Sequence, residues 1–297
     1  MPARQESFGA RLRTAMDTHG PLCVGIDPHA ALLSSWGLPD DVAGLETFAL
    51  TCVEAFGGVV AAVKPQSAFF ERFGSAGVAV LDRTLAGLRE AGTLSILDVK
   101  RGDIGSTMAG YADAYLGEES PLRADAITVS PYLGYGSLRP ALDLAGRTGR
   151  GVFVLALTSN PEGASVQHAQ VAPASEELGA DATSVAAGIV AGAAADNSQA
   201  AGEGILGSVG LVVGATIGDA VANLGIDLAG ANAPLLAPGV GAQGGTAADL
   251  ARVFGQARPN VLASSSRDVL SAGPSASELR ERAIQVAETL IGTLGLR

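Results

Sequence analysis

The sequence has little cysteine, little positive charge and no long apolar run, and each shortage excludes a class of protein. Two cysteines, Cys23 and Cys52, cannot form a disulfide framework or a zinc site by themselves. Both lie in apolar segments, so we expect buried thiols in a reducing compartment. Lysine and arginine number 19 against 30 acidic residues, for a net charge of −11. Nucleic acids and anionic membranes are excluded as partners, because neutralising phosphates requires clustered basic residues.

The apolar segments are too short or too interrupted to target or cross a membrane. Residues 1–20 carry three arginines but no continuous apolar core, so we do not expect a signal peptide. The most apolar stretch, residues 209–217, is short and rich in glycine. We therefore expect a cytoplasmic protein. Its 297 residues, 47% of them hydrophobic, suffice for one large α/β domain, which we assign to 1–297.

Short apolar runs recur along the chain, and most of them end in a polar residue. Runs of about four to seven residues rich in Val, Ile and Leu are typical of strands buried on both faces of a parallel sheet. Proline at or just after five of the runs marks the exits from strands into loops. The predicted strands are Leu22–Asp27, Val59–Lys64, Leu94–Lys100, Ala126–Ser130, Val152–Thr158, Val209–Gly214, Leu235–Ala237 and Asn260–Ser264.

Segments with helical spacing alternate with these runs, for example residues 45–56, 78–88 and 247–254. Eight strands alternating with helices predict a (β/α)8 TIM barrel. A doubly wound open sheet stays an alternative, because periodicity does not reveal closure. The interval Ser159–Ser208, between strands five and six, is unusually long and contains an Ala/Gly-rich tract from Gly179 to Ala201. We interpret it as an enlarged loop with a small-residue helix packed on the barrel.

Charged residues end the first three predicted strands. Asp98 and Lys100 are two apart, so they would point to the same face of a strand. Asp27 and Lys64 end the two preceding strands, and in a barrel all four would converge on one rim, with Asp103 following in the loop. Alternating signs offset the cost of desolvation. A lysine flanked by carboxylates stays protonated, so it could protonate a carbanion that develops beside it. The alternative is that these charged residues form a structural ion pair that closes the end of the barrel.

A glycine-rich loop follows the seventh strand, at residues 237–245, and Ser266 and Arg267 follow the eighth. Barrels often bind phosphate at these two loops, because glycines let backbone N–H groups approach an anion. Arg267 adds a cation with a forked donor. Glycines that merely form turns are the alternative for the loop alone. Paired with Arg267, the loop predicts a site for a phosphorylated small molecule whose reactive end lies over strands two and three.

The segment 98–104 and the loop 237–245 together resemble the orotidine 5'-phosphate decarboxylase family. The longer pattern with residues 23–29 and 158–161 resembles its second, bacterial subfamily, and the likeness covers Leu22 to Leu270, least in Ser165–Ser208. The resemblance implies a dimeric barrel that converts orotidine monophosphate to UMP and CO₂, in the synthesis of pyrimidines, without metal or organic cofactor. In it, Lys100 would protonate C6 and Asp98 would lie against the substrate carboxylate.

The resemblance also implies the roles of residues that spacing alone does not assign. Asp103 and Thr107 would come from the partner subunit, Asp103 to complete a Lys64-Asp98-Lys100-Asp103 network and Thr107 to contact the ribose. Asp27 and Lys64 would also contact the ribose. The phosphate and pyrimidine contacts would be Gln243, on a closing loop, with Ser266, Arg267 and Ser159.

Two other functions are weighed against this one. A relative could use the Asp-x-Lys-x-x-Asp element on a sugar phosphate through a Mg²⁺-bound enediolate, but that chemistry needs an acid where this chain has Lys64. A catalytically silent barrel could sense a nucleotide phosphate. Asp98, Lys100 and Asp103 together argue against a sensor, because simple binding does not require two acids confined beside a lysine.

Overall fold

Eight parallel strands form a closed barrel in the computed structural model, which describes residues 6–171, 183–240 and 245–296. Each strand pairs with its neighbours in chain order, and β8 pairs back with β1. The predicted (β/α)8 barrel is therefore confirmed, and the open sheet is excluded. The strands are β1 Leu22–Ile26, β2 Ala62–Pro65, β3 Leu94–Arg101, β4 Ala126–Val129, β5 Gly151–Leu157, β6 Val209–Val213, β7 Leu235–Pro238 and β8 Val261–Ser265.

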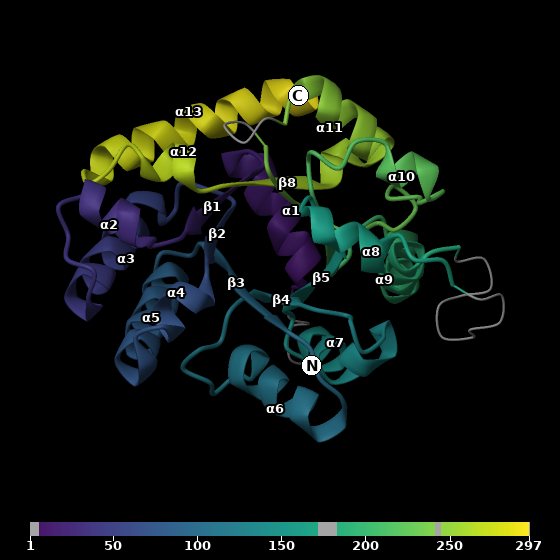
Figure 1. The fold of residues 1–297 in the computed structure, drawn as a ribbon, viewed down its shortest axis with the longest axis horizontal. Coiled ribbons are helices and arrows are strands. Elements are labelled where there is room, and N and C mark those ends of the chain that lie inside the picture. The colour runs from purple at the N-terminus through teal and green to yellow at the C-terminus, as the bar shows by residue number, and fades with distance from the viewer. Residues whose placement is uncertain (1–5, 172–182, 241–244, 297) are drawn as a thin grey trace.

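Helices surround this barrel, as Figure 1 shows. The helices before β5 are α1 Phe8–His19, α2 Ala30–Ser35, α3 Val42–Phe56, α4 Ser67–Glu71, α5 Gly74–Glu90, α6 Gly105–Leu116, η1 Tyr135–Leu138 and α7 Arg139–Arg147. Those after β5 are η2 Pro161–Gly163, α8 Ala164–Gln167, α9 Val185–Gly202, α10 Ala220–Asn223, α11 Ala247–Phe254, η4 Gly255–Asn260, α12 Arg267–Leu270 and α13 Ala276–Leu294.

The strands form where the sequence predicts them, to within one residue at each end, except at the start of β2. Residues 59–61 precede β2, which begins at Ala62. Pro65 and Pro238 are the last residues of β2 and β7 rather than the first residues after them. Proline fits there because a strand's final residue can leave its N–H out of the ladder.

Helix α1 closes the end of the barrel at which the strands begin, and Figure 1 shows it crossing the ring of strands. Phe8, Leu12 and Met16 are buried and belong to a core cluster inside the barrel. The ring of Phe8 meets that of Phe153 edge to face, with centroids 5.9 Å apart. Arg11 donates to Asp125 at 2.6 Å and so ties the helix to the start of β4. With this end filled, the end of the barrel that remains for ligands is the one where the strands finish.

The long interval between β5 and β6 contains α9, as predicted for its Ala/Gly-rich tract. The Ser184 side chain caps the helix by accepting from the N–H of Ala187. A Cβ at Gly192 would lie 2.7 Å from Tyr135 Cδ1, so a small residue is needed for this close packing. The start of the tract, residues 179–182, lies outside the described residues. In the described part of the chain, no helix combines the length and apolarity needed to cross a membrane.

Candidate active site at the carboxyl end of the barrel

Three charged side chains meet where β2 and β3 end. The ammonium group of Lys64 lies 3.1 Å from Asp98 Oδ2, and that of Lys100 lies 2.6 Å from Asp98 Oδ1. The structure thus joins three of the four residues expected on this rim by ion pairs, and the fourth, Asp27, lies close enough to Lys64 to raise its pKa. Lys64 and Asp98 are each 8% exposed. The side chain of Lys100 is 46% exposed, so its ammonium group connects the buried pair to solvent.

Charge pairing sets the protonation states in this array. Burial alone would raise the pKa of Asp98, but Lys64 and Lys100 outweigh it and lower that pKa to about 2. Burial likewise opposes the charge on Lys64, yet the carboxylates of Asp27 and Asp98 raise its pKa above the ordinary lysine value. Asp98 is therefore a carboxylate and Lys64 an ammonium group at neutral pH. Such a fixed array can stabilise negative charge that develops beside Lys100.

The backbone of Lys100 adopts a left-handed conformation, with φ at 45°. A side chain with a Cβ avoids this region, at a cost of about 1–3 kcal/mol. The strand pairing shifts at this point, because Leu97 pairs with Ile127 while Arg101 pairs with Val129. Lys100 therefore reaches Asp98 through a bulge rather than through the regular alternation that the sequence predicted.

Asp27 lies beside Ser266 on the neighbouring part of the rim. A Cβ at Gly25 would press against the hydroxyl oxygen of Ser266 and lie 3.0 Å from Asp27 Oδ2, so both side chains border this glycine. Asp27 Oδ1 is buried and has no hydrogen-bond partner among the described residues. A buried carboxylate oxygen without a donor is costly. It can be satisfied by a hydroxyl of a bound molecule.

A pocket of 640 Å³ opens where β7 and β8 end. Its lining includes Ser159, Ser266 and Arg267, which the sequence had assigned to substrate binding. Within the described residues, the side chain of Arg267 makes no hydrogen bond or ion pair, and it is exposed. Gln243 lies outside the described residues. The described part of the predicted phosphate site is therefore gathered around one pocket.

Asp103 and Thr107 are not brought to the Lys64–Asp98–Lys100 array within this chain. Asp103 Oδ1 accepts the N–H of Ile104 at 2.8 Å, and no described contact joins it to the three charged groups. Thr107 is exposed on the first turn of α6. The assignment of both residues to a partner subunit, which the sequence resemblance implied, stays a prediction.

Two groups around the array escaped the sequence reasoning. Thr128 lies in the apolar run of β4, and its hydroxyl donates to Asp98 Oδ1 at 2.7 Å. Arg101 donates to Glu71 at 2.6 Å and so ties the end of β3 to α4. A polar residue inside a fully buried strand was the signal available for Thr128. No local pattern indicates the pairing of Arg101 with Glu71, because 30 residues separate them.

The two cysteines are both buried and free, as expected from their apolar surroundings. Burial raises the pKa of the Cys23 thiol to about 12. The thiol therefore stays protonated at neutral pH, and neither cysteine is placed to act as a nucleophile.

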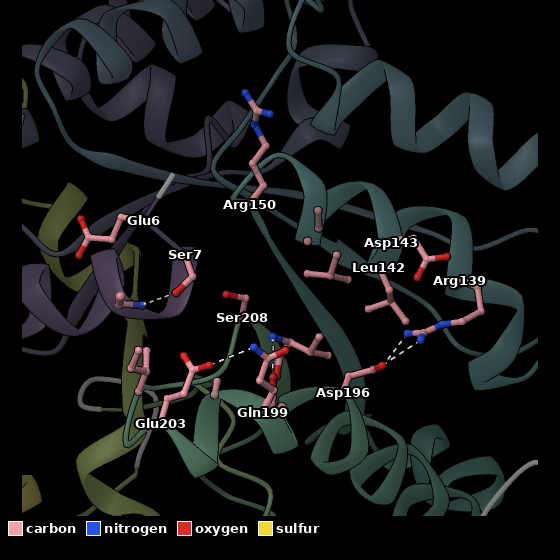
Figure 2. A pocket seen from close by; sticks show the side chains of 18 residues that line it. Glu6, Ser7, Arg139, Leu142, Asp143, Arg150, Asp196, Gln199, Glu203 and Ser208 are labelled. Carbon is pink, nitrogen blue, oxygen red and sulfur yellow. Dashed lines mark hydrogen bonds and ion pairs between the residues drawn. The ribbon is translucent and has the colours of Figure 1, made fainter. Parts of the chain in front are cut away.

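A second pocket, of 460 Å³, lies at the opposite end of the barrel, beside α1, α7 and α9 (Figure 2). Asp196 accepts two hydrogen bonds from Arg139, and Gln199 donates to Glu203 at 3.0 Å. Two of the acidic groups on this lining, Asp196 and Glu203, are thus already paired with neighbouring side chains. Of the predicted site residues that the structure describes, none borders this pocket. We therefore place the functional site at the carboxyl end.

No cluster of three or more histidine, cysteine, aspartate or glutamate side chains suited to a metal ion occurs among residues 6–171, 183–240 and 245–296. The expectation of metal-free chemistry stays a prediction.

Comparison with known proteins adds a family to this geometry. The model of the orotidine 5'-phosphate decarboxylase / HUMPS family matches residues 20–281. A relative from Streptomyces coelicolor named orotidine 5'-phosphate decarboxylase is 60% identical over 283 residues, covering 95% of this chain and 96% of the relative. A relative of the same name from Corynebacterium efficiens is 51% identical and covers 96% of each chain.

Solved structures agree with these relatives. A crystal structure from Streptomyces avermitilis assigned to the same enzyme superposes with a TM-score of 0.90 at 58% identity, covering 99% of this chain and 98% of the other. The OMP decarboxylase of Leishmania donovani gives a TM-score of 0.72 at 29% identity, over 98% of this chain and 100% of the other. The described residues that carried the resemblance lie at the carboxyl end of a barrel shared across its whole length, and the chain belongs to the orotidine 5'-phosphate decarboxylase / HUMPS family.

Proposed function

We propose that this protein converts orotidine 5'-phosphate to UMP and CO₂ by holding fixed charges around the carbon that loses CO₂. The observation that carries the proposal is the buried carboxylate of Asp98 between the ammonium groups of Lys64 and Lys100, at 3.1 and 2.6 Å. The relatives named for this reaction support it.

The difficulty of the reaction is the electron pair left in the plane of the ring. When the bond from C6 to the carboxylate breaks, CO₂ leaves and the pair stays on C6, where no neighbouring π-system delocalises it. The ammonium group of Lys100 stabilises this charge and transfers one proton to C6, and the neutral amine then regains a proton from water. Asp98 holds Lys100 in place and lies against the substrate carboxylate.

The remaining contacts orient the nucleotide far from C6. Arg267, Ser266 and Gln243 hold the phosphate, and the described part of this set borders the 640 Å³ pocket. Asp27 and Lys64 bind ribose hydroxyls, a role supported by the unpartnered oxygen of Asp27. Ser159, on the same pocket, contacts the pyrimidine. Binding the phosphate aligns C6 with Lys100, so remote contacts lower the barrier.

The working unit in this proposal is a homodimer in which Asp103 and Thr107 enter the partner's site. Large apolar side chains near Asp103 support the proposal. Ile104 is 61% exposed and Leu133 is 52% exposed, and Tyr132 beside it is 78% exposed. Exposed apolar groups gathered in one region are typical of protein interfaces. Ser130 N–H donates to the carbonyl of Arg101 at 2.8 Å, so the loops that carry these residues start side by side. We propose the cytoplasm as the location of the reaction.

The test is the loss of orotidine monophosphate absorbance on adding the purified protein, with and without EDTA. We expect rapid loss with UMP formed, unchanged by EDTA. The Lys100→Ala variant should lose turnover while still binding UMP, because its phosphate and ribose contacts remain. Loss that EDTA abolishes would favour a metal-dependent reaction. Near-normal turnover by a folded Lys100→Ala protein would remove Lys100 from the chemistry.

A further inference from the structure

The bulge that carries Asp98 and Lys100 faces a single residue of the next strand. Leu97 pairs with Ile127 and Arg101 pairs with Val129, so three residues of β3 lie opposite Thr128 alone. Regular pairing between parallel strands would give each backbone N–H a carbonyl partner. Inside this bulge the ladder is interrupted, and the N–H of Lys100 needs another acceptor.

The hydroxyl of Thr128 provides that acceptor. Lys100 N–H donates to Thr128 Oγ1 at 3.0 Å, and the same hydroxyl donates to Asp98 Oδ1 at 2.7 Å. Asp98 Oδ1 also accepts from the ammonium group of Lys100 at 2.6 Å. Thr128 is 1% exposed, so no water can replace its hydroxyl without rearrangement. One buried oxygen thus connects the backbone of Lys100 to the carboxylate that holds the ammonium group of Lys100.

A side chain of the same shape without the hydroxyl would break both connections. The N–H of Lys100 would then be left without an acceptor next to a backbone held at a φ of 45°. The backbone would gain by relaxing out of the left-handed region, which would move the ammonium group. Proton transfer needs its partners within hydrogen-bond reach, so a small displacement would slow the chemical step more than it weakens nucleotide binding.

We propose that Thr128 is a positioning residue for decarboxylation, whose hydroxyl locks the β3 bulge and thereby fixes the Lys100 ammonium group against Asp98. The inference rests on the proposed roles of Asp98 and Lys100. Thr128 acts through these two residues and does not itself contact the substrate.

The hydroxyl also leaves a signature in the pH dependence. Asp98 is faced by Lys64 from β2, by Lys100 from its own strand and by Thr128 from β4. Asp27 and Cys23, from β1 and its end, face Lys64. Thr128 contributes to lowering the pKa of Asp98 by donating to its charged form. Removing the hydroxyl should raise that pKa, so activity should begin to fall at a higher pH on the acidic side.

The experiment compares Thr128→Val and Thr128→Ser with the wild-type protein, measuring kcat and KM for orotidine monophosphate across the acidic pH range. Thr84→Val is the matched control, because Thr84 is fully buried in α5 and its hydroxyl donates to the carbonyl of Val80 within the same helix, away from the charged array. We expect Thr128→Val to lower kcat by about tenfold or more, with KM changed less than about threefold. Thr128→Ser should recover kcat to within about threefold and restore the acidic limb. Thr84→Val should match wild type.

Each other result is decisive. Wild-type kcat in Thr128→Val overturns the inference, and so does a loss that Thr128→Ser fails to recover, since packing of the methyl group would then explain it. A rise in KM as large as the fall in kcat would indicate a merely structural role. If Thr128→Val does not fold, Thr128→Ala takes its place with the same readouts. Lys100→Ala is assayed in parallel. If the wild-type protein does not decarboxylate orotidine monophosphate, the proposed function itself fails. If Lys100→Ala remains active, the role of Lys100 fails, whereas an inactive Lys100→Ala beside a fully active Thr128→Val overturns only the role of Thr128.

Discussion

Asp98 accepts hydrogen bonds from two ammonium groups and a hydroxyl, and this placement decides its protonation. Its convergence with Lys64 and Lys100 could be predicted from the sequence, because residues at the ends of neighbouring barrel strands share a rim. The left-handed backbone of Lys100 and the bond from Thr128 could not. They depend on a shift in pairing between β3 and β4 that no local pattern encodes.

The free energy of unfolding at acidic pH should depend on the charge of Asp98. Its pKa is lowered from 3.8 to about 2 in the folded protein. The stabilisation is therefore complete above the unfolded value and is lost as pH falls from about 4 to about 2, amounting to about 2 kcal/mol. Urea unfolding across this range should show the loss in wild type and a shallower slope in Asp98→Asn.

Asp113→Asn is the control, because Asp113 is exposed on α6 and outside the array. It should keep the wild-type slope. Equal slopes in wild type and Asp98→Asn would show that the charge pairing of Asp98 does not contribute to stability.

At the scale of elements, the loop after β3 runs in contact with the end of β4. The existence and order of the strands could be predicted from their apolar runs. The ends of β2 and β7 could not, because a proline can be either the last residue of a strand or the first residue after it. The contact between the loop and the end of β4 could not be predicted from the sequence either. In the structure it occurs at Gly102. A Cβ at Gly102 would press against the carbonyl oxygen of Ser130.

The close approach at Gly102 should make this glycine irreplaceable. Gly102→Ala forces the loop away from β4 and should cost roughly 1–3 kcal/mol of stability. It should also lower kcat, because the loop continues from Lys100. Gly110→Ala is the matched change, on α6, where a Cβ would meet nothing within 4 Å. That variant should gain up to about 1 kcal/mol, since alanine is favoured over glycine within a helix.

Urea unfolding and kcat measured on both variants check the prediction. A Gly102→Ala protein as stable and active as wild type would mean that the loop has room the structure does not show. A Gly110→Ala protein that is equally damaged would mean that alanine in this region is harmful for another reason.

At the scale of the whole molecule, the closure of the barrel and the filling of one end by α1 depend on contacts between distant segments. The alternation of strands and helices predicted the class, whereas closure rests on the pairing of β8 with β1. The helix α1, which fills the end of the barrel, could have been predicted as a helix, since Phe8, Leu12 and Met16 repeat at helical spacing. Nothing local tells that this apolar stripe fills the barrel rather than packing outside it.

The central claim is that a network of four charged side chains surrounds the reacting carbon. Lys64, Asp98 and Lys100 come from one chain, and Asp103 comes from the partner chain. The most direct measurement mixes two inactive variants, Lys100→Ala and Asp103→Ala, allows subunits to exchange, and assays decarboxylation in EDTA. A mixed dimer would contain one site with both changes and one with neither. Random exchange should therefore restore about a quarter of the wild-type activity.

Mixing Lys100→Ala with Asp98→Ala is the matched control, because both residues belong to the same chain's site and no mixed dimer regains an intact one. The account predicts activity from the first mixture and none from the second. No recovery from the first mixture after verified exchange, or full activity in either parent variant, would contradict it.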